Sequence, residues 1–105
     1  MDLKELLRKG RGQLLEFLPQ PEANALSETL VAFANADGGT ILVGLGSVGT
    51  VLQEVEPEHL EGALLRAQAR CRPPVKTEWQ PLETGHGTAV AISVPRSPEL
   101  HSLSD

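Results

Sequence analysis

The cationic side chains of this chain are gathered in two short segments, a distribution that suits contacts with phosphates. The 105 residues include nine lysines and arginines. Eight of them form two groups, which are Lys4, Arg8, Lys9 and Arg11 near the start and Arg66, Arg70, Arg72 and Lys76 further along. Lysine and arginine neutralise nucleic-acid phosphates whatever the base sequence. The spacing therefore predicts phosphate contacts from these two segments.

The same residues also have an ordinary structural interpretation. Over residues 2–9 the leucines fall on one side of a helix and the cations largely off it, which is typical of a solvated helix face. Arg66 and Arg70 fall near the end of a second predicted helix, where cations interact favourably with exposed carbonyl groups. Both interpretations stay open at this point.

The overall charge limits how strongly the chain can bind nucleic acid. Fourteen acidic residues outnumber nine basic ones, and the formal net charge at pH 7 is −5. Nonspecific binding depends on phosphate neutralisation, so an acidic domain is a poor candidate for strong binding of this kind. Clustering softens the objection, because a domain that is acidic as a whole can still be locally basic.

The glycine pair Gly38–Gly39 invites comparison with phosphate-binding loops. Such loops follow a strand and open a helix, so that the first helical amides point at the anion. Here the order is reversed, since the glycines close a predicted helix and open a predicted strand. Gly44, Gly46 and Gly49 form a second glycine-rich stretch with no lysine near it. We therefore expect turns rather than an ATP site, and no cofactor.

The remaining residues with catalytic or metal-binding chemistry do not form a convincing set. His59, His86 and His101 lack a metal-site spacing, and the single cysteine, Cys71, leaves too few thiols for a structural zinc site. Trp79 could stack a base, but a lone strand tryptophan more often covers a core. With three aromatic residues and no tyrosine, a stacking platform is not expected. We predict no metal and no small-molecule substrate.

The elements that position these residues follow from apolar spacing. Leu26, Leu30 and Phe33 recur at helical spacing, and Asn24 or a neighbour could cap that helix. Residues 40–43 show no polar alternation, as expected of a strand covered on both faces. The predicted elements are helices over 2–9, from about 24 to 35 and over 57–69, and strands over 13–18, 40–43, 51–52, 75–79 and 88–94.

These elements predict an α/β (α+β) fold, a mixed sheet of about four to five short strands packed with about three helices. The length favours one domain over residues 1–105. Its last part, residues 96–105, carries little structural signal and is expected to be a flexible tail. No apolar run approaches the roughly 20 residues that span a bilayer, and the start is not a secretory signal, so we expect a cytoplasmic protein with no membrane contact.

The stretch FANADGGTILVG, residues 33–44, closely resembles the signature of the Schlafen AlbA-like domain. Its motif positions here are Phe33, Asn35, Asp37, Gly38, Gly39 and Gly44. Three further pieces occur in the family's order, and they are LEF at 15–17, RPPV at 72–75 and VAISVP at 90–95. The resemblance implies a DNA-binding module of bacterial transcriptional regulators, formerly described as a divergent AAA domain.

Schlafen-type ribonucleases carry three carboxylates in this domain, and the resemblance allows that set to be tested here. Carboxylates hold the divalent metals that polarise a phosphate and activate water. Glu16 matches the second position, but the first is Arg11 and the third is Gly46. The lysine that usually follows the L-E-F segment is replaced by Leu18. One ligand of three cannot hold the metals, so we predict a protein that is not an enzyme.

The leading hypothesis is a non-catalytic DNA-binding domain that contacts phosphates through its basic segments. Two alternatives stay open: a protein-interaction or dimerisation module without nucleic-acid binding, and a degenerate metal-dependent nuclease that depends on Glu16. Family domains usually continue beyond the V-P segment with a further strand. We therefore expect a domain excised from a longer chain, with the missing part able to supply a homodimer interface.

Overall fold

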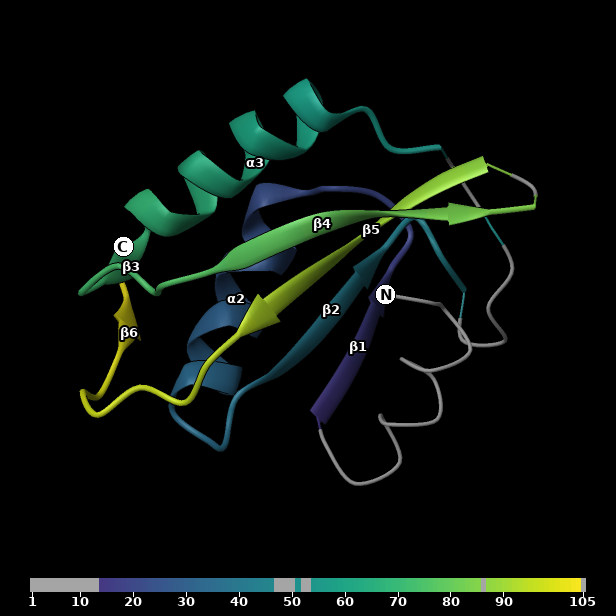
Figure 1. Cartoon of the computed structure of the whole chain (residues 1–105). Coiled ribbons are helices and arrows are strands. Elements are labelled where there is room, and N and C mark those ends of the chain that lie inside the picture. Colours follow the sequence, from purple (N-terminus) through teal and green to yellow (C-terminus); the bar gives the residue numbers. More distant parts are fainter. Residues whose placement is uncertain (1–13, 47–50, 52–53, 86, 105) are drawn as a thin grey trace.

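The structure, a computed structural model, describes residues 14–46, 51, 54–85 and 87–104. The predicted helix over residues 2–9 and residue Leu52 of the predicted return strand lie outside the described residues. Figure 1 shows the elements, which are β1 (Leu14–Leu18), α2 (Ala23–Ala34), β2 (Gly39–Val43), α3 (Pro57–Ala69), β3 (Cys71–Arg72), β4 (Glu78–Thr84), β5 (Gly87–Val94) and β6 (Ser102–Leu103).

Four of the strands form a mixed sheet in the order β1-β2-β5-β4. β1 runs parallel to β2, whereas β2 with β5 and β5 with β4 are antiparallel pairs. A parallel neighbour needs a crossover connection, and α2 supplies it between β1 and β2. β4 is an edge strand of the sheet and carries Pro81. Proline has no N–H to donate to a neighbouring strand, and an edge strand can do without that hydrogen bond.

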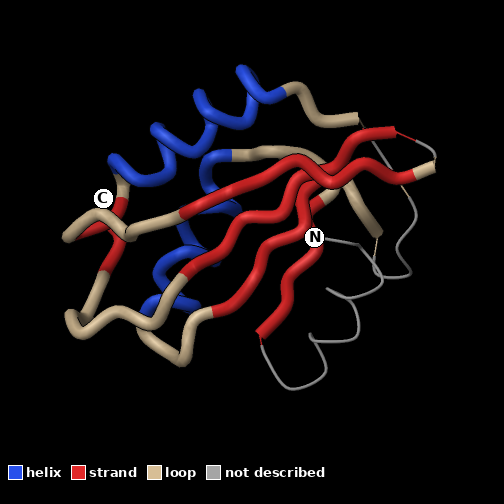
Figure 2. The backbone as a smooth tube through the Cα atoms, viewed as in Figure 1, coloured by secondary structure: helices blue, strands red, loops and turns tan. Residues whose placement is uncertain are grey.

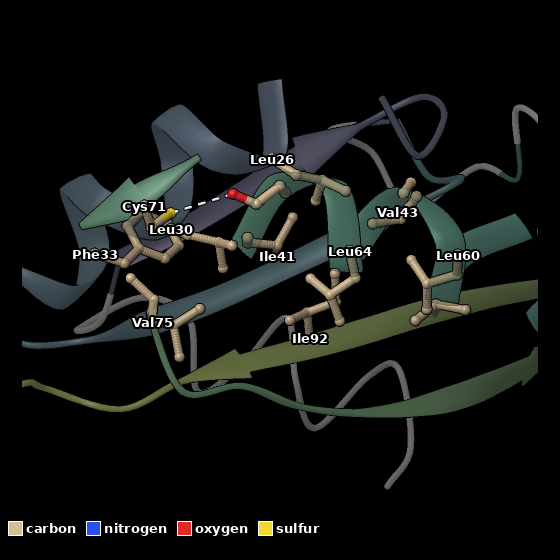
Figure 3. Close-up of a cluster of buried hydrophobic side chains, with 14 of the residues drawn as sticks. Leu26, Leu30, Phe33, Ile41, Val43, Leu60, Leu64, Cys71, Val75 and Ile92 are labelled. Atoms are coloured by element: carbon tan, nitrogen blue, oxygen red, sulfur yellow. Dashed lines mark hydrogen bonds between the residues drawn. The ribbon is translucent and has the colours of Figure 1, made fainter. Parts of the chain in front are cut away.

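Both helices cover the same face of this sheet (Figure 2). The main core lies between them and the strands, where Leu26, Leu30 and Leu60 meet Ile41 and Ile92, all fully buried (Figure 3). Burial of such side chains stabilises the fold by about 1.5–3 kcal/mol each.

The opposite face of the sheet carries a second, smaller core. Leu42, Leu82, Ala89 and Ala91 are its buried members in the four-stranded sheet, and Phe17 packs against them. Leu42 therefore points away from its neighbours Ile41 and Val43, which belong to the main core. This confirms that the central strand is covered on both faces.

The turn between α2 and β2 is closed by two glycines with different roles. Gly38 has φ +83°, a left-handed conformation, and a Cβ there would lie 2.5 Å from the carbonyl oxygen of Val94. A Cβ at Gly39 would lie 2.6 Å from the ring of Phe33, so that ring packs directly on the glycine backbone. These contacts hold the helix end against the sheet.

Several predicted elements differ from the structure in number and extent. The described residues contain two helices, a four-stranded sheet and a two-stranded sheet, rather than about three helices and one sheet of four to five strands. The predicted strand 75–79 is replaced by β4, which begins at Glu78 because Val75 turns into the main core. The return strand predicted at Val51 is a single bridge to Leu45.

The segment predicted as a flexible tail, residues 96–105, contains β6, which pairs with β3. The backbone amide of Ser104 donates a hydrogen bond of 2.7 Å to the carbonyl oxygen of Arg70, the C-cap residue of α3. The side chain of His101, in the same segment, is also buried. These contacts are long-range in sequence, so local patterns gave no sign of them.

Candidate nucleic-acid interface

The second basic group occupies one end of the molecule, where α3 ends (Figure 1). Arg66 lies in the last turn of α3, Arg70 caps the helix, and Arg72 lies in β3. Lys76 follows in the connection between β3 and β4. All four are exposed. The other group, Lys4, Arg8, Lys9 and Arg11, lies outside the described residues.

Two of these arginines also have local structural contacts. Arg72 donates a hydrogen bond of 3.1 Å from Nη1 to the carbonyl oxygen of Ala69, in the last turn of α3. A Cβ added at Gly62 would lie 3.5 Å from Nη1 of Arg66, so that guanidinium lies back along the helix. A cation at this end is favourable for the helix dipole. Arg66 and Arg72 thus both make local contacts with α3, and neither contact removes the charge of the guanidinium.

A cavity of about 340 Å³ lies next to this cationic end. One wall is formed by residues 73–76 and the other by residues 95–99, with His101 between them. Lys76 on the first wall and Arg96 on the second thus share one cavity, although twenty residues separate them in the sequence. Arg96 is the ninth basic residue, the one that lies outside both sequence clusters.

His101 ties the two walls of this cavity together. Its Nδ1 lies 2.6 Å from the carbonyl oxygen of Pro73, and its Nε2 lies 2.7 Å from Oγ of Ser97. The backbone of His101 is held in turn by Asn35, whose amide donates to its carbonyl at 2.9 Å and accepts from its N–H at 2.8 Å. Asn35 therefore acts on the cavity through His101.

Each wall has a further anchor on a helix. Gln68 of α3 donates from Nε2 to the carbonyl oxygen of Val75 and to Oγ1 of Thr77, both at 3.0 Å. The amide of Ser97 donates to the carbonyl oxygen of Ala34, the last residue of α2, at 3.1 Å. Four prolines line the same walls, and their fixed φ angles add rigidity. The cavity is thus held in shape from both helices.

Two carboxylates lie close to these cations: the pKa of Glu22, held down first by backbone hydrogen bonds, is lowered further by the charge of Arg70, and Glu99 shares the cavity lining with Lys76 and Arg96. Arg96 lies 4.0 Å from Asp37, but both side chains are largely exposed, and such pairs contribute little. The acidic residues of α3, Glu58 and Glu61, lie in its first half. At 1.5 Å per residue, Glu58 is about 18 Å from Arg70, which exceeds the Debye length of about 8 Å at physiological salt, whereas Glu61 is about 7.5 Å from Arg66 along the helix axis. Screening therefore separates Glu58 from the cations at the end of α3, but it does not separate Glu61 from Arg66.

Three other residues singled out from the sequence, Glu16, His59 and Trp79, do not line the cavity. Glu16 is exposed on β1, beside Ile41 of β2 in the register. His59 is exposed in the first turn of α3, and Trp79 packs partly buried against the main core. Among the described residues, no three His, Cys, Asp or Glu side chains form a group that could hold a metal ion.

The motif residues of the central turn serve the fold. Phe33 is buried on Gly39, and Gly44 takes φ +91° directly after β2. Asp37 is exposed, and its one recorded contact is with Arg96. Asn35 connects this motif to the cavity through His101, and Gly38 lies against the backbone of Pro95 and Arg96, two residues of the cavity lining. Within the described residues, no helix is both long and apolar enough to cross a membrane.

The fold and the cationic end define a class, a small mixed α+β domain with a proline-lined cavity between two cation-bearing loops. The sequence profile described as Schlafen, AlbA_2 matches residues 2–105. This chain belongs to the Schlafen AlbA_2 family, as the FANADGGTILVG stretch predicted.

Solved structures share the fold at low sequence identity. One is the N-terminal domain of a protein from Nitrosomonas europaea described as related to the ATP-dependent DNA helicase RecG, with TM-score 0.63 and 18% identity over 91% of this chain and 74% of that one. Another is the DIP2311 protein from Corynebacterium diphtheriae, with TM-score 0.67 and 17% identity over 98% of this chain and 23% of that one. A comparison with curated proteins finds no match.

The sequence analysis assigned no function to two residues of the cavity, for different reasons. Arg96 stands alone in the sequence, so a search for clusters passes over it. His101 lies in a segment without apolar periodicity, and a lone histidine there gives no signal. The order of residues SPELH, with a serine four positions before the histidine, was compatible with a local turn but could not reveal the contact with Pro73.

Proposed function

We propose that this domain binds nucleic acid through phosphate contacts at its cationic end. One observation carries the proposal: five cations, Arg66, Arg70, Arg72, Lys76 and Arg96, surround the end of α3 and the cavity beside it. They come from two separate segments of the sequence, and four of them belong to the eight-residue predicted site. The name of the RecG-related relative, which refers to DNA, agrees with this assignment.

Within that proposal, the domain is a non-catalytic DNA-binding part of a bacterial transcriptional regulator. Phosphate contacts of this kind position a protein on DNA without reading its sequence. Catalysis by the Schlafen carboxylate set is not proposed, because the sequence places arginine and glycine at two of its three positions. Glu16, which matches the second position, lies exposed on β1.

The test is the salt dependence of binding, measured by fluorescence anisotropy with labelled duplex and single-stranded DNA. Wild-type affinity should fall as salt rises, with a slope of about 0.7–0.9 per neutralised phosphate on a double-logarithmic plot. The triple variant Arg66→Ala/Arg70→Ala/Arg72→Ala should lose most of that slope. The matched triple lysine variant should keep it, because a phosphate contact needs the charge rather than the guanidinium.

Two outcomes would contradict the proposal. One is no binding at low salt by a sample whose circular dichroism shows it to be folded. The other is equal loss in the alanine and lysine variants, which would assign the arginines to structure through contacts such as that of Arg72 with Ala69.

Self-association is a second candidate function, favoured by exposed leucines. Leu65 on α3 is 68% exposed and Leu100, after β5, is 83% exposed. Apolar dimerisation is driven by burial of such surface and depends little on salt. Sedimentation equilibrium of wild type and of Leu65→Ser/Leu100→Ser distinguishes the two functions, since a dimer should be weakened by these serines, whereas DNA affinity should not change.

A further inference from the structure

The cavity between residues 73–76 and 95–99 combines apolar walls with cations, and that combination limits what can occupy it. Prolines 73, 74, 95 and 98 supply flat, rigid apolar surface. Lys76 and Arg96 contribute positive charge from opposite walls. At about 340 Å³ it lies near the lower end of the roughly 300–1,000 Å³ range of small-molecule sites. The fitting ligand is small, with a ring and an anionic group.

The polar side chains of the walls divide into those that build the cavity and those left for a ligand. Ser97 and His101 bond to each other, and His101 also contacts Pro73, so these groups hold the walls. Arg96 has the distant, exposed contact with Asp37, and Lys76 has no ion pair recorded among the described residues. Glu99 lies on the same lining and opposes an anion.

We propose that this cavity binds one nucleotide, with its phosphate between Lys76 and Arg96 and its base or sugar against the prolines. The inference rests on the proposed function, since Arg72 directly precedes Pro73 and phosphate contacts on the outside would continue into the cavity. It goes further by assigning a defined nucleotide subsite. An exposed, unpaired base is needed to enter it, so the inference favours single strands or strand ends over continuous duplex.

Because the walls of the cavity are already held in place, binding costs little conformational entropy. Asn35 and Gln68 hold the two loops from α2 and α3, and the hydrogen bonds of His101 close the remaining gap. A site that is already shaped loses little freedom when a ligand enters. The nucleotide therefore binds without ordering the loops, and changes should stay local to the cavity.

The first experiment is an NMR titration of the isotope-labelled chain with adenosine monophosphate, adenosine and inorganic phosphate at 0.15 M salt. The monophosphate should shift the amides of Val75, Lys76, Ser97 and His101. Adenosine and phosphate alone should each bind at least about 5-fold more weakly, because each lacks one of the two contacts. Equal affinity for phosphate and the monophosphate would overturn the inference and leave an anion site only, and no shift in the cavity would also overturn it.

Charge variants give the second test. Lys76→Ala and Arg96→Ala should each weaken monophosphate binding by about 5-fold, the upper range for an exposed charge contact, while the folded spectrum persists. Glu99→Gln should strengthen it by a similar factor, and the matched control Glu61→Gln on α3 should leave it unchanged. An equal gain in both glutamine variants would mean a general charge effect and would overturn the subsite.

The two proposals fail in different ways. If DNA binding is salt-dependent but the monophosphate does not shift the cavity, the nucleotide subsite is wrong and phosphate binding by the domain stands. If the monophosphate occupies the cavity but no DNA binds, the domain is a mononucleotide site and the proposed function is wrong.

Discussion

At the scale of single residues, the turn after α2 has two positions where even a Cβ atom would clash, so that glycine is required. Gly38 adopts a conformation that favours glycine, and Gly39 lies under the ring of Phe33. In contrast, Gly85 has nothing within 4 Å of the position of a Cβ. These three glycines provide a matched set in which only contact and conformation differ.

Replacement of Gly38 by alanine should therefore destabilise the fold strongly. The left-handed conformation costs about 1–2 kcal/mol for a residue with a Cβ, and the contact with Val94 adds about 1–3 kcal/mol of overpacking. Gly39→Ala should lose about 1–3 kcal/mol through the Phe33 ring alone. Urea denaturation measures both. Gly85→Ala should change stability by less than about 0.5 kcal/mol, and a larger loss there would refute this reading of the turn.

The side chain of Asn35 should be worth more than its exposed position suggests. It makes two hydrogen bonds to the backbone of His101, and each contributes about 0.5–1.5 kcal/mol, so Asn35→Ala should lose about 1–3 kcal/mol in urea denaturation. The control is Asn24→Ala, an exposed asparagine on the same helix, which should change stability by less than about 0.5 kcal/mol. Equal losses would show that the clamp on His101 contributes nothing.

At the scale of elements, the N-terminus of α2 depends on a glutamate. The carboxylate of Glu22 accepts hydrogen bonds from the amides of Asn24 at 2.9 Å and Ala25 at 2.8 Å. These bonds, that from Ala25 first, hold the pKa of Glu22 below its ordinary value, and the charge of Arg70 lowers it further. The sequence placed the cap at Asn24 or a neighbour; the carboxylate two residues earlier reaches the free amides from outside the helix.

This cap should make the stability of α2 depend on pH. The folded pKa of Glu22 is depressed, so its contribution is present above the unfolded pKa, near 4.5, and is lost as the pH falls through the folded value. Urea denaturation between about pH 6 and about pH 3 should show a smaller loss for Glu22→Gln than for wild type. Glu28→Gln, an exposed change on the same helix, should behave as wild type, and equal curves for all three proteins would exclude the cap as a source of the pH dependence.

Directly after α3, Cys71 makes a local contact with the last turn of that helix. The thiol of Cys71 donates to the carbonyl oxygen of Ala67 at 3.3 Å, and burial raises the pKa of that thiol (Figure 3). The sequence analysis treated this cysteine as a small apolar residue, and its complete burial confirms that interpretation.

At the scale of the whole molecule, charge is segregated along α3. Glu58 and Glu61 lie toward its start, and Arg66 and Arg70 lie at its end. The net charge of −5 therefore says little about the cationic end at physiological salt, because exposed charges more than about 8 Å apart are largely screened. At about 0.01 M salt the Debye length reaches about 30 Å, and the whole helix is felt by a bound anion.

Neutralising the acidic end should consequently matter only at low salt. Glu58→Gln should strengthen binding of a single-stranded oligonucleotide at about 0.01 M salt and leave it unchanged at about 0.15 M, as measured by fluorescence anisotropy. Glu83→Gln on β4 removes the same charge from another element and serves as the comparison. A gain that persists undiminished at 0.15 M salt would show that the two ends of α3 are not electrically independent.

The sequence by itself determined the family, the two described helices and the strands that carry the apolar runs. Periodicity is a local property: Leu26, Leu30 and Phe33 bury one face of α2 because their spacing matches one turn of a helix. The FANADGGTILVG stretch predicted the family for the same reason, since Gly38 and Gly39 form a local turn between α2 and β2.

Only the tertiary structure decided the cavity and its cations. Lys76 and Arg96 line one space because β4 and β5 pair antiparallel and bring the residues on either side of that hairpin together. His101 is held by hydrogen-bonding partners that are distant in the sequence, since Asn35 and Pro73 lie 66 and 28 positions away. Contacts over such separations leave no periodic trace, so neither the cavity nor the structure of residues 96–104 could be predicted from local patterns.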